Sequence, residues 1–90
     1  MDFEWDEQKR SRVLNERGLD FRDARLLFDG RPCYDIPSDR EGEQRKIRVG
    51  EIDGKFVAVV WTNRGSDRIR IITMRRARDE ENRRYRSLYG

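Results

Sequence analysis

The hydrophobic pattern is most regular in the second half of the chain, where it predicts an antiparallel sheet. Residues 45–52 and 68–75 alternate apolar and charged side chains, which is typical of strands with one solvated face. Residues 56–62 are apolar at nearly every position and so predict a central strand covered on both faces. Asp53-Gly54 is a strong two-residue hairpin turn. We therefore expect a meander with residues 56–62 in its middle.

Two helices are predicted before this sheet and one after it. Asp6 is a suitable N-cap for a helix that ends at about residue 16 or 17, before Gly18. Asp20 caps a second helix over residues 21–28, whose apolar positions recur at helical spacing. The third helix is expected to be capped by Asp79 and to reach the end of the chain.

Two further segments give weaker patterns. Residues 2–5 alternate polar and apolar side chains and predict a short edge strand. Residues 31–44 are irregular; a brief edge pairing near residues 33–36 is expected, followed by an exposed loop over residues 37–42. The whole pattern predicts an α+β fold with a sheet of about three to four antiparallel strands.

Composition restricts the chemistry. The chain has 90 residues, of which 43% are charged and 34% hydrophobic, so residues 1–90 are expected to form one small domain with a modest core. Its single cysteine, Cys33, permits no internal disulfide, and with no histidine a zinc site is not expected. We predict no metal and no cofactor. Nothing resembles a signal peptide or a membrane span, so we expect a cytoplasmic protein with no membrane partner.

The charge is unevenly distributed along the chain. Residues 1–44 hold 8 basic and 12 acidic side chains, whereas residues 45–90 hold 13 basic and 6 acidic ones. Four arginines lie on or just after the last predicted strand: Arg68, Arg70, Arg75 and Arg76. Any one of them is explained as a solvated strand face. Together they favour a rigid surface that binds a polyanion such as RNA or DNA.

Such a surface also permits RNA cleavage without a metal. The 2′-hydroxyl of RNA is the nucleophile, and the protein supplies a base, positive charge on the phosphorane and an acid for the leaving oxygen. Glu43 is the best placed base, unless it only forms a salt bridge. Tyr85 or a lysine can donate the proton; Tyr85 is equally explained as an anchor of the last helix on the sheet.

The sequence as a whole resembles the BrnT family of type II toxins, which are RelE-like small ribonucleases. The similarity covers nearly the full chain and rests on the order and spacing of several pieces. These are Phe3-Glu4-Trp5-Asp6 with Lys9; Gly18-Leu19-Asp20-Phe21 with Ala24 and Phe28-Asp29; Gly42-Glu43 with Arg45; Gly50; Val59-Val60-Trp61-Thr62 with Arg64-Gly65; Ile69-Arg70-Ile71-Ile72-Thr73 with Arg75 and Ala77; and Glu81 with Tyr85.

The resemblance implies a RelE-like α+β toxin that cuts RNA and inhibits translation. It also implies a BrnA-like antitoxin, in a 2:2 complex that binds operator DNA through the antitoxin. Carried over onto matching positions, it predicts as the active surface Glu43, Arg45, Thr62, Arg70, Arg75 and Tyr85. Four neighbouring basic residues are expected to bind RNA: Lys46, Arg64, Arg68 and Arg76.

The chain departs from the family pattern at a few positions. Val13 stands where the family usually has Asn, Glu16-Arg17 where it usually has Lys-His, and Trp61 where it usually has Tyr or His. Two alternatives to an active toxin follow. One is a nucleic-acid-binding module without catalysis, and the other is a degenerate toxin that serves only as an antitoxin partner.

Overall fold

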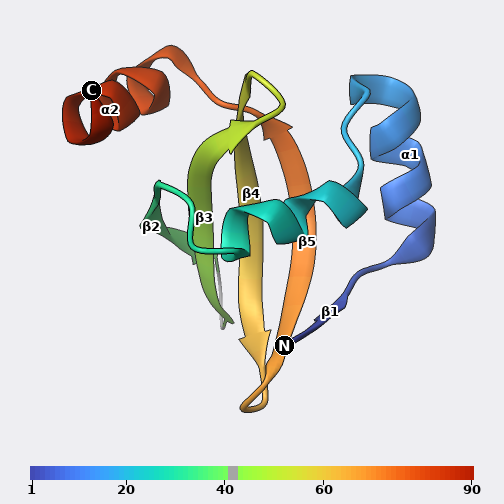
Figure 1. Cartoon of the computed structure of the whole chain (residues 1–90). Coiled ribbons are helices and arrows are strands. Elements are labelled where there is room, and N and C mark those ends of the chain that lie inside the picture. The colour runs from blue at the N-terminus through green and yellow to red at the C-terminus, as the bar shows by residue number, and fades with distance from the viewer. Residues whose placement is uncertain (41–42) are drawn as a thin grey trace.

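The computed structural model describes the backbone of residues 1–40 and 43–90, and the side chains of residues 1–38 and 44–90. This part of the chain has an α+β fold in which helical segments surround a mixed sheet (Figure 1). The helical segments are α1 (Glu7–Arg17), η1 (Phe21–Phe28) and α2 (Asp79–Tyr89). The strands are β1 (Asp2–Glu4), β2 (Cys33–Arg40), β3 (Glu43–Ile52), β4 (Lys55–Arg64) and β5 (Arg68–Arg76).

The sheet has five strands among the described residues, in the order β1-β5-β4-β3-β2. Strands β3 to β5 form the expected antiparallel meander with β4 in its middle, and β2 adds a further antiparallel strand beside β3. The prediction of an antiparallel sheet of three to four strands is corrected in two respects. The strand count is higher, and β1 pairs with β5 in parallel, Phe3 opposite Ile69. Two parallel neighbouring strands need a long connection, which here contains every element from α1 to β4.

The irregular segment predicted over residues 31–44 is also corrected. Residues Cys33–Arg40 form a continuous edge strand paired with β3, although Pro37 lies within it. Proline is tolerated on an edge strand because its missing N–H can face away from the partner. Strand propensity is weak here, and pairing with β3 decides the conformation. Residues 41 and 42 of the predicted loop lie outside the described residues.

The helices begin and end close to their predicted positions. The Asp6 carboxylate accepts the N–H groups of Gln8 and Lys9, and Gly18 ends α1 in the left-handed conformation with φ 70°. The second segment, η1, is a 3₁₀ helix capped by Asp20. In α2 the N-cap is Arg78 and not Asp79, because the backbone N–H of Arg78 is satisfied by the Glu81 side chain.

The core lies on one face of the sheet, under η1 and beside α1. Figure 1 shows η1 crossing this face and α1 running next to β5. Phe21, Leu27 and Ile71 are fully buried in this layer. Gly50 allows close contact there, since a Cβ atom at this position would lie 2.7 Å from Leu27 Cδ2. The opposite face, called here the second face, carries the alternate side chains of β2 to β5.

Helix α2 is held on the second face by polar contacts. Glu81 is only 6% exposed, and its carboxylate accepts hydrogen bonds from Nη1 and Nη2 of Arg75 at 2.8 and 3.0 Å. These bonds lower the pKa of Glu81, although burial works in the opposite direction. The Tyr34 hydroxyl donates to the backbone carbonyl of Glu81 at 2.8 Å. One residue of α2 therefore ties the helix to both β5 and β2.

We predict that Glu81→Gln destabilises the protein by about 1–3 kcal/mol, because it leaves a largely buried guanidinium without its charged partner. Urea unfolding at neutral pH measures the loss. The lowered pKa stabilises the folded state above the ordinary glutamate range, so this difference should shrink as the pH falls through the pKa of Glu81. Glu80→Gln on the exposed side of the same turn is the control. Equal stability of the two variants would contradict the assignment.

Candidate functional site

A cationic cavity lies at the edge of β5, just beyond the end of β1. Its volume is about 280 Å³, and its lining residues are Asp6, Lys9, Arg45, Arg64, Arg70, Ile71 and Ile72. The basic residues come from α1, β3, β4 and β5. Among the lining residues that the structure describes, four cations and one carboxylate thus converge, and this arrangement suits a bound anion.

Lys9 enters the cavity from the first turns of α1, where the Asp6 cap holds the helix start. Its side chain is half-buried. Burial lowers the pKa of Lys9, and the positive charge of Arg45 lowers that pKa further. Asp6 opposes the shift. An amine with a lowered pKa gives up its proton more readily than an ordinary lysine, so Lys9 is suited to proton transfer.

Arg70 is oriented by a carboxylate on the neighbouring strand. It lies opposite Glu4 in the parallel β1–β5 pair, and its Nη1 donates to Glu4 Oε2 at 2.7 Å. Glu4 also lies 3.6 Å from Arg68. The hydrogen bond from Arg70 lowers the pKa of Glu4. Glu4 therefore holds Arg70 in one place while part of its guanidinium remains open to the cavity.

Thr62 lies beside this cavity rather than in its lining. It is 7% exposed and pairs with Arg70 across the β4–β5 ladder. Its hydroxyl donates to the backbone carbonyl of Gln44 at 3.0 Å, which ties β4 to β3 next to Arg45. Thr62 thus links the strands that carry the two arginines. Of the predicted active surface, Arg45, Thr62 and Arg70 are brought together.

The structure places the other two described members of that surface elsewhere. Arg75 lies further along β5 and is bound to Glu81. Tyr85 stacks against Phe56 at 5.1 Å between ring centroids and against Tyr89 at 5.0 Å, so its ring anchors α2 at the β3–β4 hairpin. The Glu43 side chain lies outside the described residues.

The residues predicted to bind RNA are also divided. Arg64 lines the cationic cavity, and Arg68 is exposed near Glu4. Lys46 lies on the core face, with Nζ 4.8 Å from the Trp61 ring centroid. Arg76 is exposed and pairs with Val57, a core residue, which puts it on the core face of the sheet. Only two of these four residues therefore lie near the cavity.

Sequence reasoning did not predict Lys9, Glu4 or Asp6 as site residues, although it predicted Asp6 as a helix cap. Lys9 was among the matching positions, but a lysine in a polar helix carries no local signal of a site. Its place in the cavity depends on how α1 meets β5, which only the tertiary structure defines. Among the described residues, no group of three or more His, Cys, Asp or Glu side chains is arranged to hold a metal ion. No helix in the described part is long and apolar enough to cross a membrane.

Fold and cavity together define a small basic α+β protein with a cavity lined by cationic side chains on its sheet. Comparison with known proteins identifies the family. A family model described as the ribonuclease toxin BrnT of type II toxin–antitoxin systems matches residues 5–81. The chain belongs to this family, as the sequence resemblance predicted. Membership implies an RNA substrate and an antitoxin partner.

A solved structure agrees with this family. The 1.1 Å crystal structure of the Brucella abortus ribonuclease toxin, BrnT, superposes with a TM-score of 0.70 at 29% sequence identity. The match covers 88% of the present chain and 99% of that one. No curated protein gives a significant sequence match.

We predict that Arg45→Gln raises the pKa of Lys9, because it removes a positive charge from the amine's surroundings. The pKa should remain below the ordinary lysine value, since burial is the larger cause of the shift. NMR titration of the Lys9 side chain measures it. Arg25→Gln, exposed on η1, is the control and should leave the value unchanged. An unaltered Lys9 pKa in Arg45→Gln would contradict the geometry of the cavity.

Proposed function

We propose that this protein is a metal-independent endoribonuclease toxin that cleaves RNA through its 2′-hydroxyl and thereby inhibits translation. The observation that supports this proposal is the convergence of Lys9 with Arg45, Arg64 and Arg70 in one cavity. Guanidinium groups bind phosphate bidentately, and a lysine with a lowered pKa adds a proton donor next to them. A nucleic-acid-binding surface needs the arginines alone, whereas cleavage also needs the proton transfer.

In the proposed reaction, the arginines hold the scissile phosphate and stabilise the additional negative charge of the phosphorane. A base removes the 2′-hydroxyl proton, the 2′-oxygen attacks phosphorus, and the bond to the 5′-oxygen breaks. Lys9 gives its proton to that leaving oxygen. The products are a 2′,3′-cyclic phosphate and a 5′-hydroxyl. We keep Glu43, two residues before Arg45 in β3, as the proposed base.

For Arg75 and Tyr85 a catalytic role is still a prediction. Each already has a structural contact, Arg75 with Glu81 and Tyr85 with Phe56. Substitution of either residue is therefore expected to change stability, and activity must be compared at equal folded fraction. Arg45, Arg64, Arg70 and Lys9 are the residues on which the proposal depends.

Family membership supports the proposed regulation. We propose a BrnA-like antitoxin that forms a 2:2 complex with this chain and represses the operon through its own DNA-binding domain. Both proteins would act in the cytoplasm, with residues 1–90 as a single toxin domain.

A degenerate toxin is the second candidate, and it is favoured by the departures at Val13, Glu16 and Arg17. None of these three residues lines the cationic cavity. Val13 is buried in the core, Glu16 is exposed, and Arg17 donates to the Met74 carbonyl at 2.8 Å. The departures therefore leave the proposed proton donor and phosphate ligands in place, which supports an active enzyme.

In cells, we expect induction of this chain to arrest growth and co-expression of the neighbouring open reading frame to restore it. Arg70→Ala should abolish the arrest, because it removes a phosphate ligand fixed by Glu4. Arg25→Ala, which changes the charge equally on the other face, is the control. Absence of arrest at a verified expression level would favour the degenerate toxin.

With purified protein, we expect RNA cleavage to continue in excess EDTA and to leave 2′,3′-cyclic phosphate ends. Arg70→Ala and Lys9→Met should each lower the cleavage rate by about 10²–10³, the usual effect of losing one group that stabilises or protonates the transition state. Single-turnover assays on labelled RNA, combined with end-group analysis, measure both results. Cleavage that stops with EDTA, or binding without products, would refute this mechanism.

A further inference from the structure

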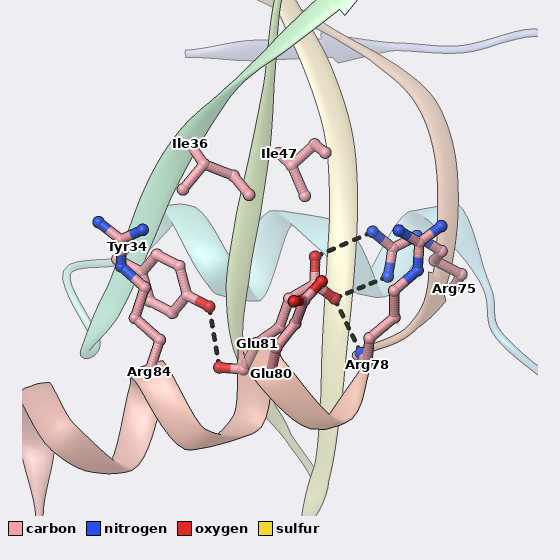
Figure 2. A pocket seen from close by; sticks show the side chains of 8 residues that line it. All are labelled: Tyr34, Ile36, Ile47, Arg75, Arg78, Glu80, Glu81 and Arg84. Carbon is pink, nitrogen blue, oxygen red and sulfur yellow. Dashed lines mark hydrogen bonds and ion pairs between the residues drawn. The ribbon is translucent and has the colours of Figure 1, made fainter.

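A second cavity lies on the second face, under α2. Its volume is about 330 Å³, and its lining residues are Tyr34, Ile36, Ile47, Arg75, Arg78, Glu80, Glu81 and Arg84. Figure 2 shows Ile36 and Ile47 above the helix, Tyr34 with Arg84 at one end, and Arg75 with Arg78 at the other. This second cavity, called the groove below, therefore combines a half-buried apolar surface with charged ends.

The strand register connects this groove with the cationic cavity. Ile47 pairs with Val60, and two residues further along β4 Thr62 pairs with Arg70. Arg45 precedes Ile47 by two residues on β3, so strand alternation puts both on the second face. Successive side chains on one face of a strand are roughly 7 Å apart. The apolar part of the groove is thus next to the row that carries Arg45 and Arg70.

The charged groups at the two ends of the groove differ in whether they can contact a ligand. Arg75 and Glu81 neutralise each other and hold α2 in place. Arg84 is exposed, and its guanidinium carbon lies 5.2 Å from the Tyr34 ring centroid. This stack presents a planar cation beside the half-buried Ile36 and Ile47 side chains. The exposed carboxylate of Glu80 adds a hydrogen-bond acceptor at the rim.

We propose that this groove binds a base of single-stranded RNA, next to the phosphate held in the cationic cavity. The inference deepens the proposed function and rests on it. A base needs a planar or apolar surface for its faces and a few polar groups for its edge, and arginine planes serve as stacking surfaces in RNA recognition. Arg84 and the two isoleucines supply the surface, and Glu80 can accept a base N–H. An RNA strand whose phosphate lies in the cationic cavity would therefore place a neighbouring base over the groove.

Sequence preference would follow from this arrangement. The cationic cavity contacts phosphate, which is the same at every nucleotide, whereas the groove contacts a base. Glu80 accepts hydrogen bonds and cannot donate them when ionised, so bases with exposed N–H groups are favoured in the groove. The groove is then the part of the site that selects where RNA is cut.

The test measures binding to a labelled single-stranded RNA that carries 2′-O-methyl groups and so cannot be cleaved. A series of these oligonucleotides has one abasic position each. For the wild type, we expect one abasic position to weaken binding by about 5- to 100-fold, the range typical of losing one stacked base. Arg84→Ala should bind the intact RNA more weakly and lose most of that discrimination, because the base and the arginine then no longer interact.

Two further variants separate stacking from charge. Arg83→Ala removes the same charge from the neighbouring position of α2, which does not line the groove, and should keep the abasic penalty. Arg84→Lys keeps the charge without the planar group, and should retain the salt dependence of binding while losing discrimination. Melting temperatures of all three variants check that α2 stays folded.

Equal abasic penalties in the wild type and Arg84→Ala would overturn the inference. So would unchanged RNA binding by Arg84→Ala together with a weakened antitoxin complex, which would assign the groove to the antitoxin. Because the RNA in this assay is not cleaved, the result is independent of catalysis. The cleavage assay on unmodified RNA tests the proposed function separately.

Discussion

The parallel pairing of β1 with β5 is the constraint on which the candidate site depends. It brings the first residues of the chain beside the last strand, Phe3 opposite Ile69 and Glu4 opposite Arg70. Glu4 thereby orients Arg70. The pairing also fixes where α1 begins after β1, and so brings Lys9 of α1 into the cavity. Without this pairing, neither Lys9 nor the Glu4 carboxylate would lie near the arginines.

Electrostatics explains why this site is suited to an anion. Lys9, Arg45, Arg64 and Arg70 share one small cavity in which Asp6 is the only carboxylate among the lining residues that the structure describes. Burial is the main cause of the lowered pKa of Lys9, and the positive charge of Arg45 disfavours the protonated amine further. A phosphate group would relieve the repulsion. In the function proposed here, the same concentration of positive charge would favour the binding of an RNA phosphate and the release of a proton from Lys9.

On the second face, some residues hold α2 in place and others line the groove beneath it. Arg75 and Tyr85, predicted from the sequence to be part of the active surface, contact Glu81 and Phe56 and hold α2 against the sheet. Held in this way, α2 forms one wall of the groove that we assign to an RNA base. The cationic cavity and the groove are both built on β3 and β5, so the pairing of the strands in the sheet sets the distance between them.

The sequence by itself determined the local elements. Asp6 and Gly18 mark the two ends of α1, because capping and the left-handed conformation are local requirements. Asp53-Gly54, between an alternating segment and an apolar one, defined the β3–β4 hairpin. The family could also be recognised from the sequence, by the order and spacing of several short matching segments. Only the tertiary structure decided that β1 joins the sheet in parallel and that Cys33–Arg40 forms an edge strand, because these pairings depend on distant partners. For the same reason it alone brought Lys9 to Arg70, residues from opposite halves of the chain, and separated Arg75 and Tyr85 from them.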